Sequence, residues 1–395
     1  MNCLIDFLTD GKQKSLINMV QNRDETFENE LESYQRLFIV ELKHCIGKAR
    51  RNTLDVEISS ALPAASSGKD YKNLHNRKAF CQDDNCYFAY ACSNFYNILS
   101  QIKEEEIRHF FQGIKLCYTL WIDSQTTLAL EALDRLLKEQ ELIHDVAYVG
   151  DENSDDELII QNITDQVFFR GRMTDQFLSK LEMFHVPYNK RYNLHNERFS
   201  LTGQPLLYLG NSIADVVEEL GVNWDDRETI HRLRVSSFEF TSTGKKRRIF
   251  DLRCNIWNDM KGTQQSTFSK KKFFRNILST ICSFQKRKEL EGYAFKEEYV
   301  IPQMLAQVLK QNHYDGICYY STKQFHKYCS DMDSQKIIGP ELSMFYRENI
   351  ALFTHMNNTL ENVNENIVES IYDEALRKDL EISMPVSIQN IKKVL

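Results

Sequence analysis

The spacing of apolar residues changes after Leu158, and this change limits the possible folds more than any single residue does. Upstream of it, apolar residues recur every three, four or seven positions, which is the period of amphipathic helices. Pro63 is the one proline in the first 150 residues, and helix interiors tolerate proline poorly. Downstream, short apolar runs bounded by Gly, Pro, Asn and Ser predict strands mixed with helices. We therefore expect an all-α domain over residues 1–150, followed by an α+β domain over residues 158–395.

The two expected domains are joined by a segment without apolar side chains, residues 150–157. Such an acidic run is typical of a solvated linker. Another loop is expected over residues 59–72, where small and polar residues mix with glycine and proline. Helices are predicted over residues 12–50, 86–102, 104–118 and 126–142, and strands over residues 166–169, 206–209, 233–240 and 317–320.

The charge of the chain and its first residues narrow the classes of partner. The formal net charge is -7, which repels phosphate backbones, so nucleic acid is not expected as a partner. The start, MNCLIDFLTDGKQ, lacks the basic and then apolar pattern of a secretory signal, and no later stretch approaches the roughly 18 apolar residues of a membrane span. We expect a cytoplasmic protein that does not enter membranes and whose ten cysteines stay reduced.

A group of potential zinc ligands occurs in the expected helical domain. Cys81, Cys86 and Cys92 lie near His75 in the sequence. The gaps of four and five residues between the cysteines differ from the C-x-x-C spacing of structural zinc sites. We therefore expect no metal.

The segment from residue 182 to residue 221 carries the most informative local pattern. Ser212 followed by Asp215 resembles a capping box and predicts the start of a helix, which Gly221 ends. At about 100° per residue, Glu219 lies roughly 60° from the edge of the apolar stripe of this helix, whereas Glu218 lies about 100° away. Glu219 is therefore the carboxylate better placed to face a cleft.

A longer ordered pattern crosses this segment and resembles the core of the RES domain family. The string RFSLTGQPLLYLGNS, followed by E-E-L, matches the family pattern and puts its arginine on Arg198, its tyrosine on Tyr208 and its glutamate on Glu219. A later block, YVIPQMLAQVLKQNHYDGICYYS, resembles the second half of the family and puts its serine on Ser321. The resemblance extends from about Val167 to the segment SMPVSIQNI.

Residues upstream of this core add further matches to the same family. The string FFRGR supplies the family's early arginine at Arg170 or Arg172, and the surroundings of His185 resemble a variant found in larger members. Both arginines and His185 are therefore candidates for binding the substrate.

The resemblance implies a fold similar to ADP-ribosyltransferases and the consumption of NAD as a substrate, without a bound cofactor. Members of the family break the nicotinamide glycosidic bond with water or phosphate as the acceptor, and many are toxins that a partner protein holds in check. For this chain the resemblance implies an NAD hydrolase or phosphorylase that acts as a bacterial toxin or defence effector. An antitoxin, a sensor protein or a second copy of the chain is the candidate partner, and the helical N-terminal domain is expected to regulate or assemble the enzyme.

The residue types at the matched positions suit this chemistry on their own. Loss of nicotinamide spreads positive charge over the ribose, so a fixed carboxylate such as Glu219 stabilises the transition state. A pyrophosphate needs a planar and permanently charged donor, which Arg198 and one of the two early arginines provide. Tyr208 can stack on a base ring, and the matched serine can fix a ribose hydroxyl or the nicotinamide amide.

The matched residues also allow purely structural roles and a different reaction. An arginine commonly pairs with a nearby carboxylate, a tyrosine in an apolar strand is commonly part of the core, and a serine at a strand end commonly caps a turn. The same pocket could instead transfer ADP-ribose to a macromolecule, or the α+β half could be a non-catalytic interaction module. The basic stretches over residues 245–248 and 269–275 could contact an acidic partner, although solvated loops more commonly have this composition.

Overall fold

The structure is a computed structural model, and it describes residues 26–29, 31–36, 39, 101–143, 166–222, 226–253, 269–284, 294–321, 348–356 and 371–387. Most of the predicted helix over residues 86–102 lies outside these ranges. The predicted loop, the predicted linker and the cysteine cluster near His75 also lie outside them. Where the predicted helix over residues 12–50 is described, between Phe27 and Ile39, it is helical.

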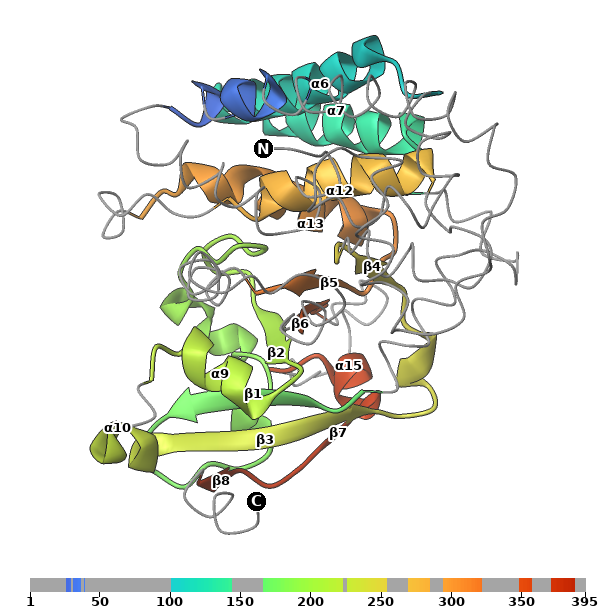
Figure 1. Ribbon diagram of the computed structural model, residues 1–395. Coiled ribbons are helices and arrows are strands. Elements are labelled where there is room, and N and C mark those ends of the chain that lie inside the picture. Colours follow the sequence, from blue (N-terminus) through green and yellow to red (C-terminus); the bar gives the residue numbers. More distant parts are fainter. Residues whose placement is uncertain are drawn as a thin grey trace, which may run out of the picture. The chain divides into compact units, whose positions relative to one another are not determined.

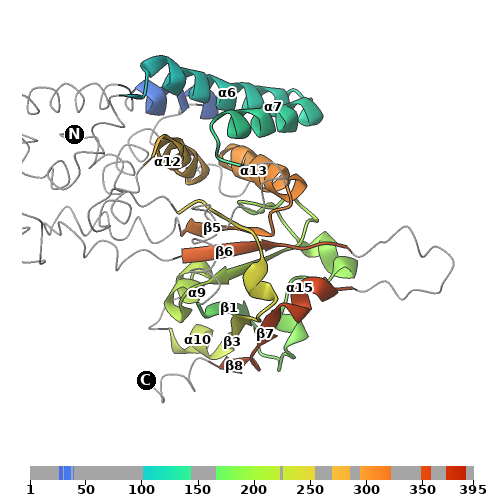
Figure 2. The same ribbon diagram turned by 90° about the vertical axis from the view of Figure 1, so that its right-hand side faces the viewer.

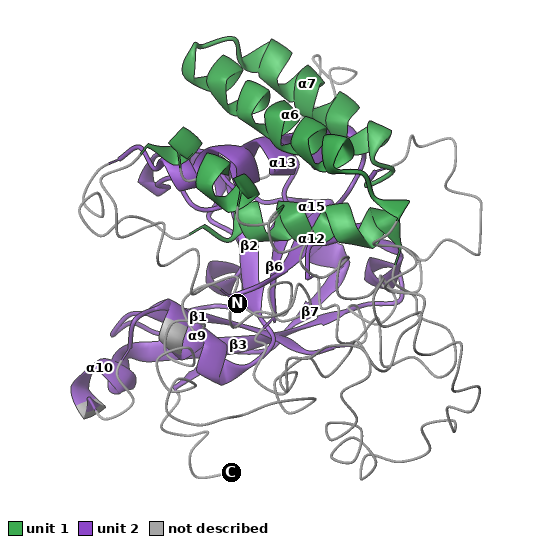
Figure 3. Cartoon of the chain, turned by 45° about the horizontal axis from the view of Figure 1, so that its top comes forward, with its two compact units in different colours: residues 1–142, 254–291, 325–346 green, residues 143–253, 292–324, 347–395 purple. Residues whose placement is uncertain are grey.

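The chain divides into two compact units (Figure 3). Unit 1 comprises residues 1–142, 254–291 and 325–346, and unit 2 comprises residues 143–253, 292–324 and 347–395. The described elements of unit 1 are helices, whereas unit 2 combines a sheet with short helices. The predicted α+β class with a helical N-terminal region is therefore confirmed. The chain also returns to unit 1 twice after residue 253, which the predicted division did not anticipate, and the domain border between residues 150 and 158 stays a prediction.

Unit 1 contains a helical hairpin and a third helix from much later in the chain. Helices α6 (Glu104–Ile122) and α7 (Thr126–Glu139) pack against each other, which confirms the two helices predicted there. The third helix is α12 (Lys270–Cys282). The ring of Phe274 in α12 meets the ring of Phe110 in α6 with 5.2 Å between their centroids. Apolar contact of this kind joins the two distant stretches of sequence into one core.

Unit 2 is built on a sheet that has eight strands within the described residues. The strand order is β4-β5-β6-β2-β1-β3-β7, and β8 also pairs with β3. The β4–β5 pair is parallel and the other pairs are antiparallel. Figure 1 shows β1 and β3 lying side by side. The strands are β1 (Phe168–Met173), β2 (Leu206–Gly210), β3 (Leu233–Phe240), β4 (Ile249–Asp251), β5 (Gly316–Tyr320), β6 (Glu348–Phe353), β7 (Leu380–Ile382) and β8 (Val386–Ser387).

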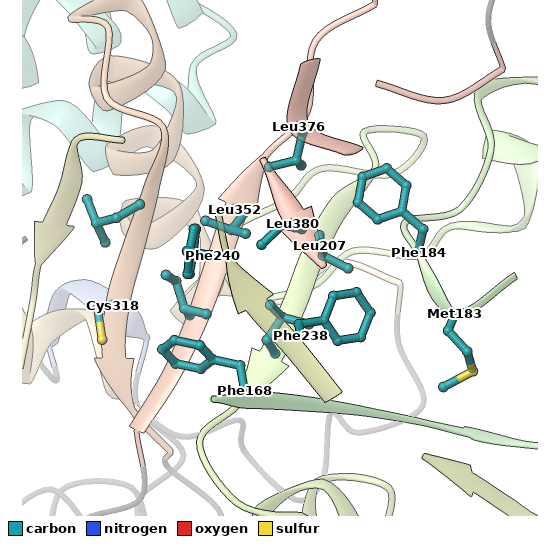
Figure 4. Packing of buried hydrophobic residues seen from close by; sticks show 13 residues of the cluster. Phe168, Met183, Phe184, Leu207, Phe238, Phe240, Cys318, Leu352, Leu376 and Leu380 are labelled. Carbon is teal, nitrogen blue, oxygen red and sulfur yellow. The ribbon is translucent and has the colours of Figure 1, made fainter. Parts of the chain in front are cut away.

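Side chains on one face of this sheet form the main core of unit 2 (Figure 4). Phe168 in β1 lies opposite Phe238 in β3, and both are fully buried. Because side chains alternate along a strand, Arg170 and Arg172 lie on the same face as Phe168. The buried residues of this cluster are Phe168, Met183, Phe184, Leu207, Leu209, Phe238, Phe240, Ile249, Cys318, Ile350, Leu352, Leu376 and Leu380.

The second face of the sheet carries a different set of residues. Gly210 in β2 lies opposite Phe169 in β1 and opposite Asn349 in β6, so all three positions share a face. Tyr208 shares it too, because it is two residues from Gly210. This second face therefore collects Tyr208 and Asn349, and it is opposite to the face that carries the two early arginines.

Helix α9 (Ile213–Glu219) packs on the second face, against β1 and β2 (Figure 2). The close approach depends on Gly171, since a Cβ atom there would lie 2.4 Å from Val216 Cγ1. The chain leaves the helix at Gly221, where a φ of 67° suits a residue without a side chain. Within the described residues, unit 2 also contains the helices α10 (Arg227–Arg232), α13 (Val300–Gln311) and α15 (Glu374–Lys378).

Among the described helices of both units, none combines the length and the apolar character that crossing a membrane requires.

Candidate functional site

Glu219 is the last residue of α9, and local interactions fix the helix that presents it. Ser212 Oγ donates a hydrogen bond to Asp215 Oδ2 over 2.7 Å and accepts one from the backbone N–H of Asp215 over 3.1 Å. These bonds close the first turn of the helix and satisfy a backbone donor that would otherwise lack a partner there. The sequence pattern at Ser212 and Asp215 predicted this start, and the structure confirms it.

The Glu219 carboxylate meets two polar side chains from neighbouring strands of the sheet. Ser321 Oγ, just beyond the end of β5, donates to Glu219 Oε1 over 2.5 Å. Asn349 Nδ2, in β6, donates to the same oxygen over 3.1 Å. Ser321 and Asn349 are each 5% exposed. Because both donors come from ordered strand ends, they orient the carboxylate and leave it little rotational freedom.

Asn349 was not singled out by the sequence analysis. It lies within a mostly apolar run, E-N-I-A-L-F. A polar side chain in such a run is the sequence signal that could have identified it, because a buried amide needs a hydrogen-bond partner. Its partner Glu219 is 130 residues away in the sequence, so only the fold identifies the pair. Asn349 is therefore an addition to the candidate site.

Arg198 lies in a tight turn next to this group. The backbone N–H of Glu197 donates to the carbonyl of Ser200 over 3.0 Å, and the reverse bond measures 3.3 Å. Arg198 and Phe199 form the tip of the turn. The guanidinium of Arg198 lies over the ring of Tyr299, 5.0 Å from its centroid. A flat guanidinium gains cation–π attraction in this position.

The hydroxyl of Tyr208 contacts the same turn. It donates to Ser200 Oγ over 3.2 Å and accepts from the backbone N–H of Phe199 over 3.3 Å. Burial raises the pKa of Tyr208 above its usual range, and the nearby Glu197 adds to this effect. The hydroxyl therefore stays protonated and can serve as a donor and an acceptor at neutral pH.

Tyr319 links the carboxylate and the turn. Its ring lies 4.7 Å from the ring of Phe199, between centroids, at an angle of 58°. Burial raises the pKa of Tyr319 far above its usual range, with further contributions from Tyr208 and Glu219, while Arg198 opposes the shift. The pKa of this one buried ring thus depends on the matched arginine, tyrosine and glutamate. The structure brings Arg198, Tyr208 and Glu219 together around Tyr319, and Ser321 contacts Glu219 directly.

The two early arginines lie elsewhere. Arg170 Nη1 and Arg172 Nη2 both donate to the carbonyl oxygen of Phe184, over 2.7 and 3.3 Å. Burial, with the nearby charge of Arg172, lowers the pKa of Arg170 to about 9. Because these side chains start from the opposite face of the sheet, the structure does not bring them to Glu219. Their sequence-based assignment to substrate binding stays a prediction that this arrangement does not support.

His185 belongs to the neighbourhood of these arginines. It is fully buried, its Nδ1 lies 2.8 Å from the carbonyl of Val186, and its Nε2 accepts the backbone N–H of Asp373 over 2.9 Å. Burial lowers the pKa of His185 to about 4, and Arg170 and Arg172 add to the shift. Both ring nitrogens therefore contact backbone groups. The ring connects the segment after Phe184 with the start of α15 through these contacts.

Part of the chain is similar in sequence to a known protein. The chain is 31% identical over 239 residues to a protein of Bacillus subtilis (strain 168) named "Putative toxin YopC". The match covers 56% of this chain and 50% of the relative, so the chain spans about half the length of the curated relative it matches. No model of a protein family matches the chain. No solved structure matches it either.

Proposed function

We propose that the chain is an NAD-cleaving enzyme of the RES type that acts as a toxin. The observation that carries the proposal is the contact between Glu219 and Ser321, two residues 102 positions apart. The resemblance requires this glutamate and this serine, and a chance match in sequence would not require them to meet. The neighbouring turn of Arg198 and the hydroxyl of Tyr208 support the same assignment.

The geometry around Glu219 suits cleavage of the nicotinamide glycosidic bond. As that bond breaks, positive charge develops on the ribose, and a carboxylate held in place stabilises it without having to reorganise. Ser321 and Asn349 hold Glu219 through its Oε1 atom. In this proposal Glu219 is the catalytic residue, while Asn349 positions it. Ser321 either positions it as well or exchanges this bond for one to the substrate.

Arg198 is the proposed ligand of the diphosphate. A guanidinium can bind two phosphate oxygens in one plane, and it keeps its charge at any physiological pH. The ring of Tyr299 supports the guanidinium from one side, which reduces the side-chain freedom that binding has to remove. Arg170 and Arg172 are not needed for this role.

The toxin role is supported by the name of the relative in Bacillus subtilis. An enzyme that depletes NAD arrests the cell that makes it, so a producing cell needs a means of restraint. We therefore propose an antitoxin protein as the partner. The 31% identity extends over 239 residues, and the argument from the name of the relative applies to those residues.

Product analysis with purified protein tests the proposal. NAD labelled in its adenylate part is incubated with the protein, with and without phosphate, and the products are identified by mass. Free ADP-ribose or its phosphorylated form, released together with nicotinamide, is the expected result. Label transferred to macromolecules would replace the proposal by ADP-ribosylation of a protein or nucleic acid. Intact NAD would favour the non-catalytic interaction module.

A further inference from the structure

The turn that carries Arg198 is held by side chains from two separate elements. We propose that Gln303 in α13 is a positioning residue that sets the Arg198 guanidinium in place for the diphosphate of the substrate. The inference rests on the proposed function, because it takes Arg198 as the ligand of that diphosphate. Gln303 lies in the later matched block, YVIPQ, but the resemblance assigns no role to it, and neither does the glutamate–serine contact.

Gln303 binds both carbonyl groups that close the turn. Its Nε2 donates to the carbonyl of Glu197 over 2.9 Å and to the carbonyl of Ser200 over 3.2 Å. The amide group has two hydrogens, so one nitrogen can serve both acceptors. Gln303 is 5% exposed, and a buried amide without these acceptors would keep unsatisfied donors, which is unfavourable. The turn and the helix therefore hold each other in one arrangement.

Tyr208 holds the turn from the sheet. Its hydroxyl accepts the backbone N–H of Phe199 and donates to Ser200 Oγ. Gln303 and Tyr208 together provide side-chain partners for the carbonyl groups at both ends of the turn and for the N–H at its tip. These side-chain bonds add to the two backbone bonds of the turn, so helix α13 and strand β2 both fix its position.

A fixed turn favours substrate binding because the arginine side chain is long and flexible. An arginine side chain has many rotamers and loses much of its conformational entropy when it becomes ordered. Gln303 fixes the backbone and the ring of Tyr299 contacts the guanidinium. Much of the loss of side-chain entropy therefore occurs during folding and not during binding. Removal of the Gln303 amide should therefore weaken NAD binding through Arg198, while the chemistry at Glu219 continues.

The test combines kinetics with a structural readout in the full-length protein. Gln303→Met keeps the length and apolar character of the side chain but removes both donors. We expect the KM for NAD to rise about tenfold, as the loss of one to two hydrogen bonds implies, with kcat within about twofold. Gln307→Met, one helical turn further along α13, is the matched control and should leave both constants unchanged.

A double-mutant cycle separates positioning from general damage. If Gln303 acts through Arg198, Gln303→Met should raise KM much less in the Arg198→Ala background than in the wild type. Independent and additive effects would overturn the inference. If Gln303→Met does not fold, Tyr208→Phe removes the other support while keeping the ring, and it should give the same pattern of raised KM and coupling to Arg198.

Hydrogen exchange of the peptide that spans residues 196–202 gives a readout that does not depend on NAD. Exchange in this peptide should be faster in Gln303→Met than in the wild type and unchanged in Gln307→Met. Unchanged exchange in Gln303→Met would overturn the inference whether or not NAD is cleaved. A wild-type protein that leaves NAD intact would instead overturn the proposed function, and with it the link to the diphosphate, while the exchange data still decide whether Gln303 holds the turn.

Discussion

At the scale of single residues, the negative charge of Glu219 is the feature on which the proposed chemistry depends most. Glu219→Gln keeps the shape and can still accept the bonds from Ser321 and Asn349, but it removes the charge. Because that charge acts more strongly on the transition state than on bound NAD, we expect kcat to fall by about 10² or more with little change in KM. Steady-state kinetics with NAD measure both constants.

Two control substitutions accompany this prediction. Glu239→Gln changes an exposed carboxylate in β3, and Glu218→Gln changes the residue next to the proposed catalytic one. Both should keep nearly wild-type turnover. An inactive Glu218→Gln with an active Glu219→Gln would mean that the matched glutamate is off by one position. Full turnover in all three variants would rule out the carboxylate mechanism even if NAD still binds.

His185 should make the stability of the protein depend on pH. Its pKa is about 4 in the folded protein and about 6.5 in an unfolded chain, so the unfolded state binds the proton more readily between these values. The free energy of unfolding should therefore decrease as the pH falls from about 6.5 to about 4, by about 2 kcal/mol between pH 7 and pH 5. Urea unfolding at these two pH values measures the difference.

The matching variant is His185→Gln, which can still offer a carbonyl to the N–H of Asp373. It should be less stable at pH 7 but should lose this contribution to the pH dependence. His195→Gln, at an exposed position, should keep the full dependence. An unchanged KM in His185→Gln, measured on folded protein, would argue for the structural role; a raised KM would restore His185 as a residue that binds the substrate.

At the scale of elements, the sequence predicted those features that depend on local pattern. The bounds of β2, β3 and β5 were predicted to within one residue, since their apolar runs end at turn residues. The start of α9 and its end before Gly221 followed from capping chemistry. Strands β4 and β6 were missed: β4 has only three residues, and β6 begins with the polar residues Glu348 and Asn349 and not with an apolar run.

Features that depend on pairing between distant strands could not be predicted in this way. Arg170 and Arg172 share a string with the family pattern, but the register of β1 against β2 directs them to the core face. Asn349 and Gln303 act through contacts with residues more than 100 positions away. The matched residues were found because a family resemblance summarises three-dimensional contacts that periodicity alone does not contain.

Gly171 tests the coupling between β1 and α9. In Gly171→Ala the new Cβ would lie 2.4 Å from Val216 Cγ1 and 2.9 Å from Leu220 Cδ1, so these side chains must give way, and we expect α9 to shift with the stiff side chain of Val216. We expect a loss of about 1–3 kcal/mol in the free energy of unfolding, together with a lower kcat because Glu219 moves with the helix. Thermal unfolding and kinetics are measured on the same samples.

A second substitution and a distant glycine control this prediction. Val216→Ala added to Gly171→Ala makes room for the methyl group and should restore much of the kcat. Gly113→Ala in α6 also creates a close contact, 2.8 Å from Leu136 Cδ2, but it lies in unit 1. It should leave kcat unchanged, and a comparable loss of kcat there would show that overpacking anywhere lowers activity.

At the scale of the whole molecule, the order of the two units along the chain differs from a simple division into two halves. Helix α12 lies in the second half of the sequence but belongs to unit 1. Five of its apolar residues are completely buried, and rings near it meet rings from the first 150 residues, as Phe274 meets Phe110 and Phe284 meets Phe27. The five completely buried apolar residues of α12 are Phe273, Phe274, Ile277, Leu278 and Ile281.

A fragment that starts near Leu158 tests this organisation. The sequence division predicts that such a fragment keeps NAD binding, whereas the composition of unit 1 predicts that it leaves the apolar face of α12 without its partners. Burial of a large apolar side chain contributes about 1.5–3 kcal/mol, and in this fragment Phe274 and Phe284 lose their ring contacts with Phe110 and Phe27, which is a large loss against the roughly 5–15 kcal/mol of a typical domain. We expect low soluble yield and strong binding of an apolar dye by what remains soluble, and we expect co-expression of residues 1–157 as a separate chain to restore both properties. A soluble fragment that unfolds cooperatively and binds NAD would show instead that α12 does not need the N-terminal helices, and the first 150 residues would then be an independent regulatory domain.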